Sequence, residues 1–259
     1  MNAHFAQLSS EERSTLARLK ATLALRLADT ALQVDAPLQT ACSARSVDLK
    51  IGVGGLGGTI ALGDDPANRA RLLLFFPSAE AAVAVLSGKN GAALPLPLGL
   101  GAFKAMSTFR RASARATELL RDAAAASSVR AELLLAATLY GLEAIAGERY
   151  LARRMQIVPD GTVRVRVEDI EYFAVKRGNG IEIQKRAARA ARTAASAADS
   201  ADAELSFSDY RSAIEVLSGA RQAVVALGSG QVRIEGLLPL VQGLFAVLDR
   251  LSWYLGVEV

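Results

Sequence analysis

A phrase that occurs twice is the feature that most constrains the fold of this chain. Residues 74–88 read LFFPSAEAAVAVLSG, and residues 205–219 read LSFSDYRSAIEVLSG, so that Leu, Phe, Ala, Val and the closing Leu-Ser-Gly recur in register. A second shared phrase, PLxxGxF, follows each copy and begins at Pro97 and at Pro239. A repeat of this length corresponds to a whole domain, because solenoid units repeat every 20–50 residues or so. The sequence therefore predicts two related modules in tandem.

Length and composition agree with this division. The chain has 259 residues, and each half is long enough to bury a core of its own. We place the modules at residues 1–126 and 127–259. Apolar residues make up 51% of the chain and aromatic residues only 5%, so the interior is built mainly from Ala, Leu and Val. This composition favours helices over an aromatic-rich β-sandwich.

Cysteine content and the absence of targeting or membrane-spanning patterns predict where the protein is located. Cys42 is the single cysteine and can form no internal disulfide, which fits a reducing compartment. The first residues lack the basic and apolar regions of a signal peptide. The longest apolar run, residues 133–146, contains Glu143 and is too short to span a bilayer. We expect a soluble, cytoplasmic protein.

Hydrophobic periodicity and turn residues predict the same order of elements in both modules. In the first module we expect a helix over residues 10–28 with a Ser9–Glu12 capping box, strands over 47–51, 59–62 and 71–76, a helix ending in Leu-Ser-Gly, and a helix from about Leu98. In the second we expect helices over 131–146, 208–218 and 237–255, and strands over 162–167, 172–176, 181–185, 203–207 and 232–235. Residues 186–202 lack large apolar side chains and are predicted to be an insert outside the core, either a mobile loop or a solvated helix.

These elements resemble the sterol carrier protein 2 (SCP2) family. The similarity is good over residues 163–248 and weaker over 47–106, and it rests on an Ala-Asp strand, a helix that ends in a Leu-x-Gly-Lys-like phrase, a further strand and an apolar helix. Lys89 follows Gly88 as the family pattern requires, whereas Ala220 takes that place in the second copy. The resemblance implies an α+β fold of two tandem SCP2-like modules, each a mostly antiparallel sheet covered on one side by helices. It also implies a hydrophobic cavity that accepts sterols, fatty acyl chains or isoprenoid tails.

The sequence contains few of the residues that catalysis or cofactor binding requires. Residues 52–58 match GxGxxG, but β-branched and turn residues follow where a dinucleotide site needs a helix, so we predict a hairpin between two strands. His4 is the only histidine, which leaves no Ser-His-Asp or Cys-His arrangement and few zinc or haem ligands. The carboxylates at Glu143, Asp169, Glu171 and Asp209 are interpreted as surface charges and helix caps. We predict a protein that is not an enzyme and holds neither a cofactor nor a metal.

Two helices carry more apolar surface than one packing face needs. In residues 237–255 and 131–146 the apolar side chains leave little of the opposite face polar, so a second face must meet a ligand, the other module or a second subunit. The residues predicted to line a ligand site are Leu139, Tyr140, Leu217, Leu240, Leu244, Phe245 and Leu248 in the second module, and Leu86, Phe103 and Met106 in the first.

Basic residues suggest a further contact. Lys104, Arg110, Arg111 and Arg115 follow one another on an expected helix and are predicted to touch anionic lipid headgroups transiently, although a helix with a wet basic face has the same pattern. Basic and aromatic residues do not alternate as in proteins that bind single strands, so nucleic acid is not an expected partner.

The resulting hypothesis is a sterol-carrier-like protein that binds or transports an apolar lipid without catalysis. The alternative is a scaffold or accessory protein whose apolar helices form a homodimer or dock an enzyme of lipid or quinone biosynthesis. The sequence does not separate these two functions, because helices that line a cavity and helices that face a partner have the same composition.

Overall fold

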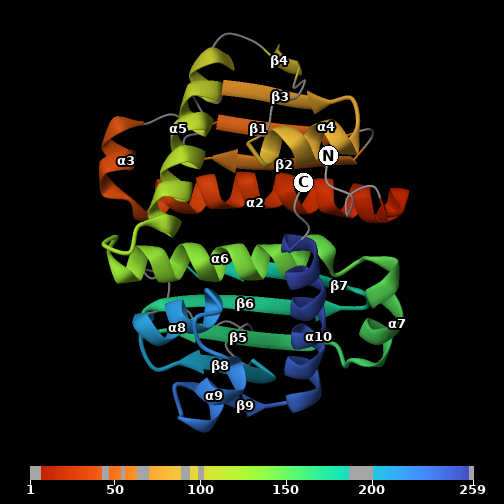
Figure 1. Ribbon diagram of the computed structural model, residues 1–259, viewed down its shortest axis with the longest axis vertical. Coiled ribbons are helices and arrows are strands. Elements are labelled where there is room, and N and C mark those ends of the chain that lie inside the picture. The colour runs from red at the N-terminus through yellow and green to blue at the C-terminus, as the bar shows by residue number, and fades with distance from the viewer. Residues whose placement is uncertain are drawn as a thin grey trace. The chain divides into compact units, whose positions relative to one another are not determined.

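The computed structural model describes residues 7–42, 47–53, 56–62, 70–88, 94–98, 102–186 and 201–256, with side chains described at 7–42, 76–88, 106–186 and 201–256. The chain divides into two compact units, Met1–Ala125 with Tyr254–Val259, and Ala126–Trp253 (Figure 1). Each unit combines helices with a mixed β-sheet, and the predicted α+β class is confirmed.

The first unit is a sheet with helices packed against it. Its elements are α2 (Ser10–Val34), α3 (Ala36–Ala41), β1 (Val47–Val53), β2 (Leu56–Leu62), β3 (Ala70–Phe76), α4 (Ala79–Leu86), β4 (Leu94–Leu98) and α5 (Ala102–Arg121). Its described strands lie in the order β2-β1-β3-β4; β1 is parallel to β3, and the other pairs are antiparallel. Helix α2 packs along α4 and α5.

Two local predictions can be compared with this unit. Strands β1 and β2, on either side of residues 54–55, form an antiparallel pair with Val53 opposite Leu56, as expected for a hairpin. The helix expected from about Leu98 begins instead at Ala102, because Leu98 is the last residue of β4. Pro95 and Pro97 lie in β4, and an edge strand tolerates them because one of its sides has no ladder of hydrogen bonds to lose.

The second unit has a wider sheet, with five described strands against four in the first unit. Its elements are α6 (Ser127–Ile145), α7 (Arg149–Ile157), β5 (Gly161–Val167), β6 (Ile170–Arg177), β7 (Gly180–Lys185), β8 (Ala203–Phe207), α8 (Tyr210–Leu217), α9 (Ala223–Gly228), β9 (Val232–Gly236) and α10 (Leu238–Leu255). Its described strands lie in the order β7-β6-β5-β8-β9, with β5 parallel to β8. Helices α6, α8 and α10 lie over one face of this sheet (Figure 1).

The repeated phrase has the same structure in both units. It forms β3 and α4 in the first unit and β8 and α8 in the second, and the strand order β2-β1-β3-β4 matches β6-β5-β8-β9. Ser78 and Asp209, which align in the repeat, are the N-caps of α4 and α8. Gly88 and Gly219 both follow the helix with φ 77°, a left-handed conformation that favours glycine. The shared phrase therefore specifies a strand, a cap and a helix end.

The ends of the predicted insert belong to the ordered second unit. Arg186 donates its backbone N–H to the Glu171 carbonyl over 3.2 Å, and the Asp202 carboxylate accepts the Thr162 N–H over 2.8 Å. Arg186 and Asp202 thus belong to the folded second unit, although the composition placed both in the insert. Residues 187–200 lie outside the described part of the chain.

A buried ion pair fastens α10 to the start of α7. Arg250 donates from Nε to Glu148 Oε2 over 3.0 Å, and a second nitrogen bonds Oε1, so the pair is bidentate. The side chains of Glu148 and Arg250 are only 3% and 14% exposed. The guanidinium also lies 3.9 Å from the ring centroid of Trp253 and 4.9 Å from that of Tyr150. Burial and stacking hold this arginine in one geometry.

Glu148→Ala should destabilise the second unit strongly, because it leaves a largely buried guanidinium without its carboxylate. We expect a loss of about 3 kcal/mol in the free energy of unfolding, measured by urea denaturation followed by circular dichroism and by the fluorescence of Trp253, the only tryptophan. Arg211→Ala is the matched control, since it removes an exposed ion pair with Glu215 and should cost less than about 1 kcal/mol. Equal losses in the two variants would contradict a special role for the buried pair.

Candidate functional site

An apolar cavity of about 80 Å³ lies inside the second unit, between the sheet and its helices. Its walls come from four helices and three strands. The lining residues are Leu135, Thr138, Leu139 and Leu142 of α6, Val165 of β5, Leu205 and Phe207 of β8, Val216 and Leu217 of α8, Ala223 and Leu227 of α9, Val232 of β9, and Leu244, Phe245 and Leu248 of α10.

Regular periodicity brings these side chains to one place. The α6 residues follow the spacing i, i+3, i+4, i+7, which is one stripe of a helix. In the strands, every second residue faces the helices, so Val163, Val165 and Val167 of β5 are buried, whereas Arg164 and Arg166 lie on the opposite face. The cavity therefore lies where the apolar face of the sheet meets the apolar stripes of α6 and α10.

Among the described lining residues, no side chain is left free to form a hydrogen bond with an occupant. Thr138 is the one lining residue with a polar side chain, and its Oγ1 donates to the Leu134 carbonyl over 2.9 Å within α6. The remaining lining residues are Leu, Val, Ala and Phe. A cavity of this composition stays free of ordered water and favours apolar occupants.

Two glycines let α10 come close to its neighbours. A Cβ at Gly243 would lie 2.6 and 2.7 Å from the methyl groups of Val158, and a Cβ at Gly141 of α6 would lie 2.7 Å from Leu251. All three distances are shorter than van der Waals contact. Gly243 belongs to the repeated PLxxGxF phrase, and Phe245 two residues later lines the cavity. The repeated phrase thus contains both a residue that packs closely against Val158 and a residue that lines the cavity.

Gly243→Ala should destabilise the second unit although alanine is the better helix former. The new methyl group must displace Val158 or α10, at a cost of about 1–3 kcal/mol. Val158→Ala in the same chain should recover part of that loss. Gly228→Ala is the matched control, because no atom lies within 4 Å of a Cβ there, and it should be neutral or stabilising by up to about 1 kcal/mol. Urea denaturation of the parent and of the three variants gives the four free energies of unfolding. A Gly243→Ala variant as stable as the parent would show that the contact is not tight.

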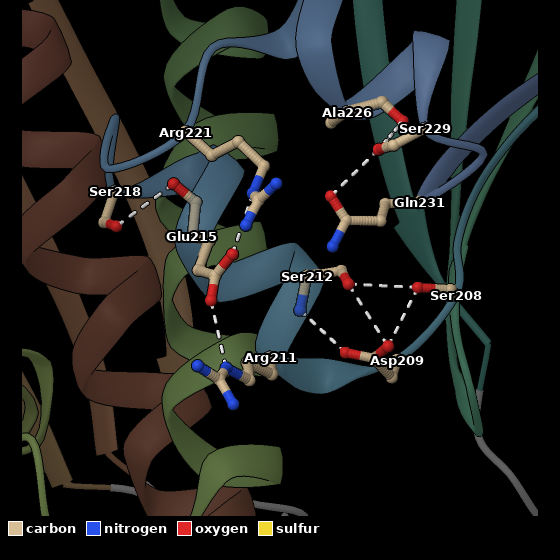
Figure 2. Close-up of polar contacts among 10 residues, drawn as sticks. All are labelled: Ser208, Asp209, Arg211, Ser212, Glu215, Ser218, Arg221, Ala226, Ser229 and Gln231. Atoms are coloured by element: carbon tan, nitrogen blue, oxygen red, sulfur yellow. Dashed lines mark hydrogen bonds and ion pairs between the residues drawn. The ribbon is translucent and has the colours of Figure 1, made fainter.

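Polar contacts secure the part of the wall formed by α8 and α9 (Figure 2). Glu215 accepts from Arg211 over 3.0 Å and from Arg221 over 2.8 Å, and these hydrogen bonds lower the pKa of Glu215. Arg221 lies in the loop between the two helices, so its bond ties the start of α9 to α8. At the other end of α9, Ser229 Oγ donates to the Ala226 carbonyl over 3.2 Å and lies 3.2 Å from Gln231 Oε1. Each end of this short helix is therefore held by hydrogen bonds of partly exposed side chains.

The turn between β5 and β6 holds the start of α8. Asp209 caps the helix by accepting the Ser212 N–H over 2.7 Å, which lowers the pKa of Asp209. The Tyr210 N–H donates to Glu168 over 3.2 Å, and the Tyr210 hydroxyl donates to Asp169. This hydroxyl bond to a carboxylate is the main cause that raises the pKa of Tyr210 to about 12. The sequence interpretation of Asp209 as a helix cap is confirmed.

Stability should fall at high pH as Tyr210 ionises. The folded-state pKa of about 12 lies above the unfolded value of 10.0, so the protonated phenol stabilises the fold fully below pH 10 and the contribution is lost as pH rises toward 12. Asp169→Asn should bring one tyrosine back toward its ordinary pKa in a titration of phenolate absorbance. Glu182→Gln, on the exposed face of β7, should leave the titration unchanged. A parent curve identical to that of Asp169→Asn would disprove the coupling.

Five of the residues predicted for the second module line the cavity: Leu139, Leu217, Leu244, Phe245 and Leu248. Two others do not. Tyr140 is buried with its ring against Tyr172 in an edge-on arrangement, at a centroid distance of 6.3 Å. Leu240 is fully buried beside Gly161, one turn before Leu244 on α10. The sequence analysis missed α9, whose Ala223 and Leu227 complete the wall.

The residues predicted for the first module lie apart from this cavity. Leu86 is the last residue of α4 and is half-buried, as is Met106 in α5. Phe103 and Lys104 lie in α5, but their side chains fall outside the described residues. No described residue of the first unit lines the cavity of the second.

The predicted membrane-contact residues fall into two kinds. Arg110 and Arg111 are exposed on α5. Arg115 instead donates to both carboxylate oxygens of Asp35, at 3.0 and 3.3 Å, and pairs with Glu118. These bonds, first of all those to Asp35, raise the pKa of Arg115. Arg115 therefore fastens α5 to the start of α3, and the lipid contact of the other residues stays a prediction.

The described residues contain no group of three or more His, Cys, Asp or Glu side chains that could hold a metal ion. Nor does any described helix have both the length and the apolar character needed to cross a membrane. The carboxylates of Glu143 and Glu171 have structural partners: Glu143 accepts the Ile183 N–H over 3.5 Å, and Glu171 pairs with Arg164 over 3.4 Å.

Comparisons with known proteins add little to this description. No family model matches the chain, and no curated protein matches it. Among solved structures, the chain is similar to one described as "UbiJ-SCP2 Ubiquinone synthesis protein", with 18% sequence identity and a TM-score of 0.32. That match covers 44% of this chain and 89% of the other. At this TM-score the similarity carries no information about a ligand.

Proposed function

We propose that the second unit binds the chain of an apolar lipid in the cavity beneath α8, α9 and α10. The observation that supports this most directly is a cavity in which Thr138, the only polar side chain among the described lining residues, is already bonded within its own helix. With such walls, the favourable free energy of binding comes from the removal of apolar surface from water, at about 25 cal/mol per Å². Binding of this kind requires no catalytic residue, in accord with the prediction that the protein is not an enzyme.

The size of the cavity favours a linear chain over a fused ring system. A dry protein cavity of about 150 Å³ accommodates a benzene molecule, and the volume here is about 80 Å³. A fatty acyl or isoprenoid segment is narrower than a sterol and fits between the helices with smaller movements. We therefore propose acyl or isoprenoid chains as the preferred ligands among the three classes that the SCP2 resemblance implies.

The short helix α9 is the wall that a ligand would displace most easily. It has six residues and no side-chain bond at its N-cap, and its Val224 and Val225 point to solvent. Gly219 and Gly230, which flank it, have φ of 77° and 74°. Glycine supplies the backbone freedom that a moving segment needs. Entry beneath α9 would leave the sheet, α6 and α10 in place.

Phe245→Asp should abolish uptake of a fluorescent fatty acid or a fluorescent isoprenoid alcohol. The substitution places an unpaired charge in a wall that contains no partner for it, and the cost of desolvating that charge opposes ligand burial. Ile157→Asp introduces the same charge at an exposed position of α7 and should bind as the parent does. Circular dichroism and urea denaturation identify variants that have lost the fold, and Leu217→Phe, which fills the cavity without charge, provides a second test.

A sterol competitor distinguishes the ligand classes. It should displace the fluorescent chain more weakly than oleate does. Lack of uptake by the parent protein, from solution and from vesicles alike, would overturn the binding proposal and favour the accessory function that the sequence also allows. Equal uptake by the parent, Phe245→Asp and Leu217→Phe would place the ligand elsewhere.

A further inference from the structure

Strand β9 forms one edge of the second sheet, and β8 is its only partner strand among the described residues. The Ser208 N–H donates to the Gln231 carbonyl over 2.9 Å at the end of this pair. Backbone groups of an antiparallel strand point alternately to its two sides. The N–H and C=O groups of Val232, Ile234 and Gly236 therefore point away from β8, along the free edge.

Two opposite charges lie on this edge strand. Arg233 and Glu235 are both exposed, and neither forms an ion pair or side-chain hydrogen bond with any described residue. They are two positions apart and so share one face of the sheet, the face that also carries Arg164, Arg166 and Glu204. Those three are linked by ion pairs of 3.4 Å. The charged side chains inside the sheet thus form ion pairs, whereas Arg233 and Glu235 at its edge form none with the described residues.

Exposed apolar side chains lie on both sides of β9 in the sequence. Val224 and Val225 of α9 are 79% and 51% exposed, and Leu237 and Leu238, directly after the strand, are 38% and 53% exposed. Helix α9, β9 and the first turn of α10 lie at the same end of the second unit (Figure 1). Free backbone groups together with exposed apolar side chains are the usual features of an interaction surface.

We propose that this edge pairs with β9 of a second copy of the chain, antiparallel and with the two-fold axis at Ile234. In that register Arg233 lies opposite Glu235 of the partner subunit, and the same pair recurs across the axis. The free N–H and C=O groups of Val232, Ile234 and Gly236 find partners in the same strand of the other copy. The two sheets then continue as one.

The choice of a second copy follows from the charge order along the strand. A matching partner strand places a negative residue opposite Arg233 and a positive one opposite Glu235, and β9 itself does so when it runs antiparallel. The antiparallel direction also brings Leu237 and Leu238 toward the α9 end of the other protomer. A stable interface buries about 800 Å² on each side, which is more than a five-residue strand provides, so the apolar flanks are a necessary part of the contact.

Charge reversal tests this register. The parent chain should be a dimer by light scattering and sedimentation over a concentration series. Arg233→Glu and Glu235→Arg should each weaken the dimer about tenfold or more, because each places like charges opposite one another at two symmetric points. The double variant R233E/E235R should restore the parent dimer. A mixture of the two single variants should form heterodimers, since one supplies two negative charges and the other two positive charges.

Arg153→Glu is the matched control, because it makes the same charge change at an exposed position of α7, and it should remain a dimer. A parent chain that is monomeric at high concentration overturns the proposal. A dimer that the single variants leave unchanged assigns the contact to another surface, and failure of R233E/E235R to restore the dimer disproves the register. Each of these outcomes is independent of lipid uptake, so the proposed ligand site can stand or fall separately.

Discussion

The position of α10 is the constraint on which the second unit depends, and the Glu148–Arg250 pair sets it at one end. Buried ion pairs add little to stability compared with apolar replacements, but they admit few alternative geometries. Gly243 sets the other end by allowing α10 to meet Val158 at a distance that no larger residue permits. Between these points α10 is held above the sheet, and the stripe formed by Leu244, Phe245 and Leu248 faces a space that it does not fill.

An unfilled space has a cost that a folded protein must offset. At about 24 cal/mol per Å³, a void near 80 Å³ corresponds to a loss of about 2 kcal/mol. The lining residues offer simple ways to remove it, since a larger side chain at Ala223 or Val216 would occupy the space. An unfilled apolar interior is expected where an occupant recovers the lost contacts, and this is the physical basis for the proposed ligand site.

Much of the fold could be predicted from local patterns, whereas the exact shape of the cavity could not. The repeated phrase predicted equivalent strands and helices because its caps and its final glycine act through the backbone alone. Leu139 and Phe245 lie in the wall of the cavity. Tyr140 does not, because one helical residue turns a side chain by about 100° and directs this ring toward Tyr172. Leu240 shares a face with Leu244 but lies one turn too early. Helix α9 was missed because six residues with two β-branched side chains have no distinct period, and the helix depends on the surface that it covers.

The Thr138 hydroxyl donates its hydrogen bond within its own helix, and this limits how the cavity could hold a bound chain. With that group already occupied, nothing in the wall fixes the rotation of a chain about its long axis or its depth along the cavity. A bound chain would slide and turn, and successive methylene groups would add affinity in similar steps of about 0.8 kcal/mol each until the space is filled. Selectivity would then depend on the length and width of the bound chain. Chains of similar dimensions but different functional groups would bind with similar affinity.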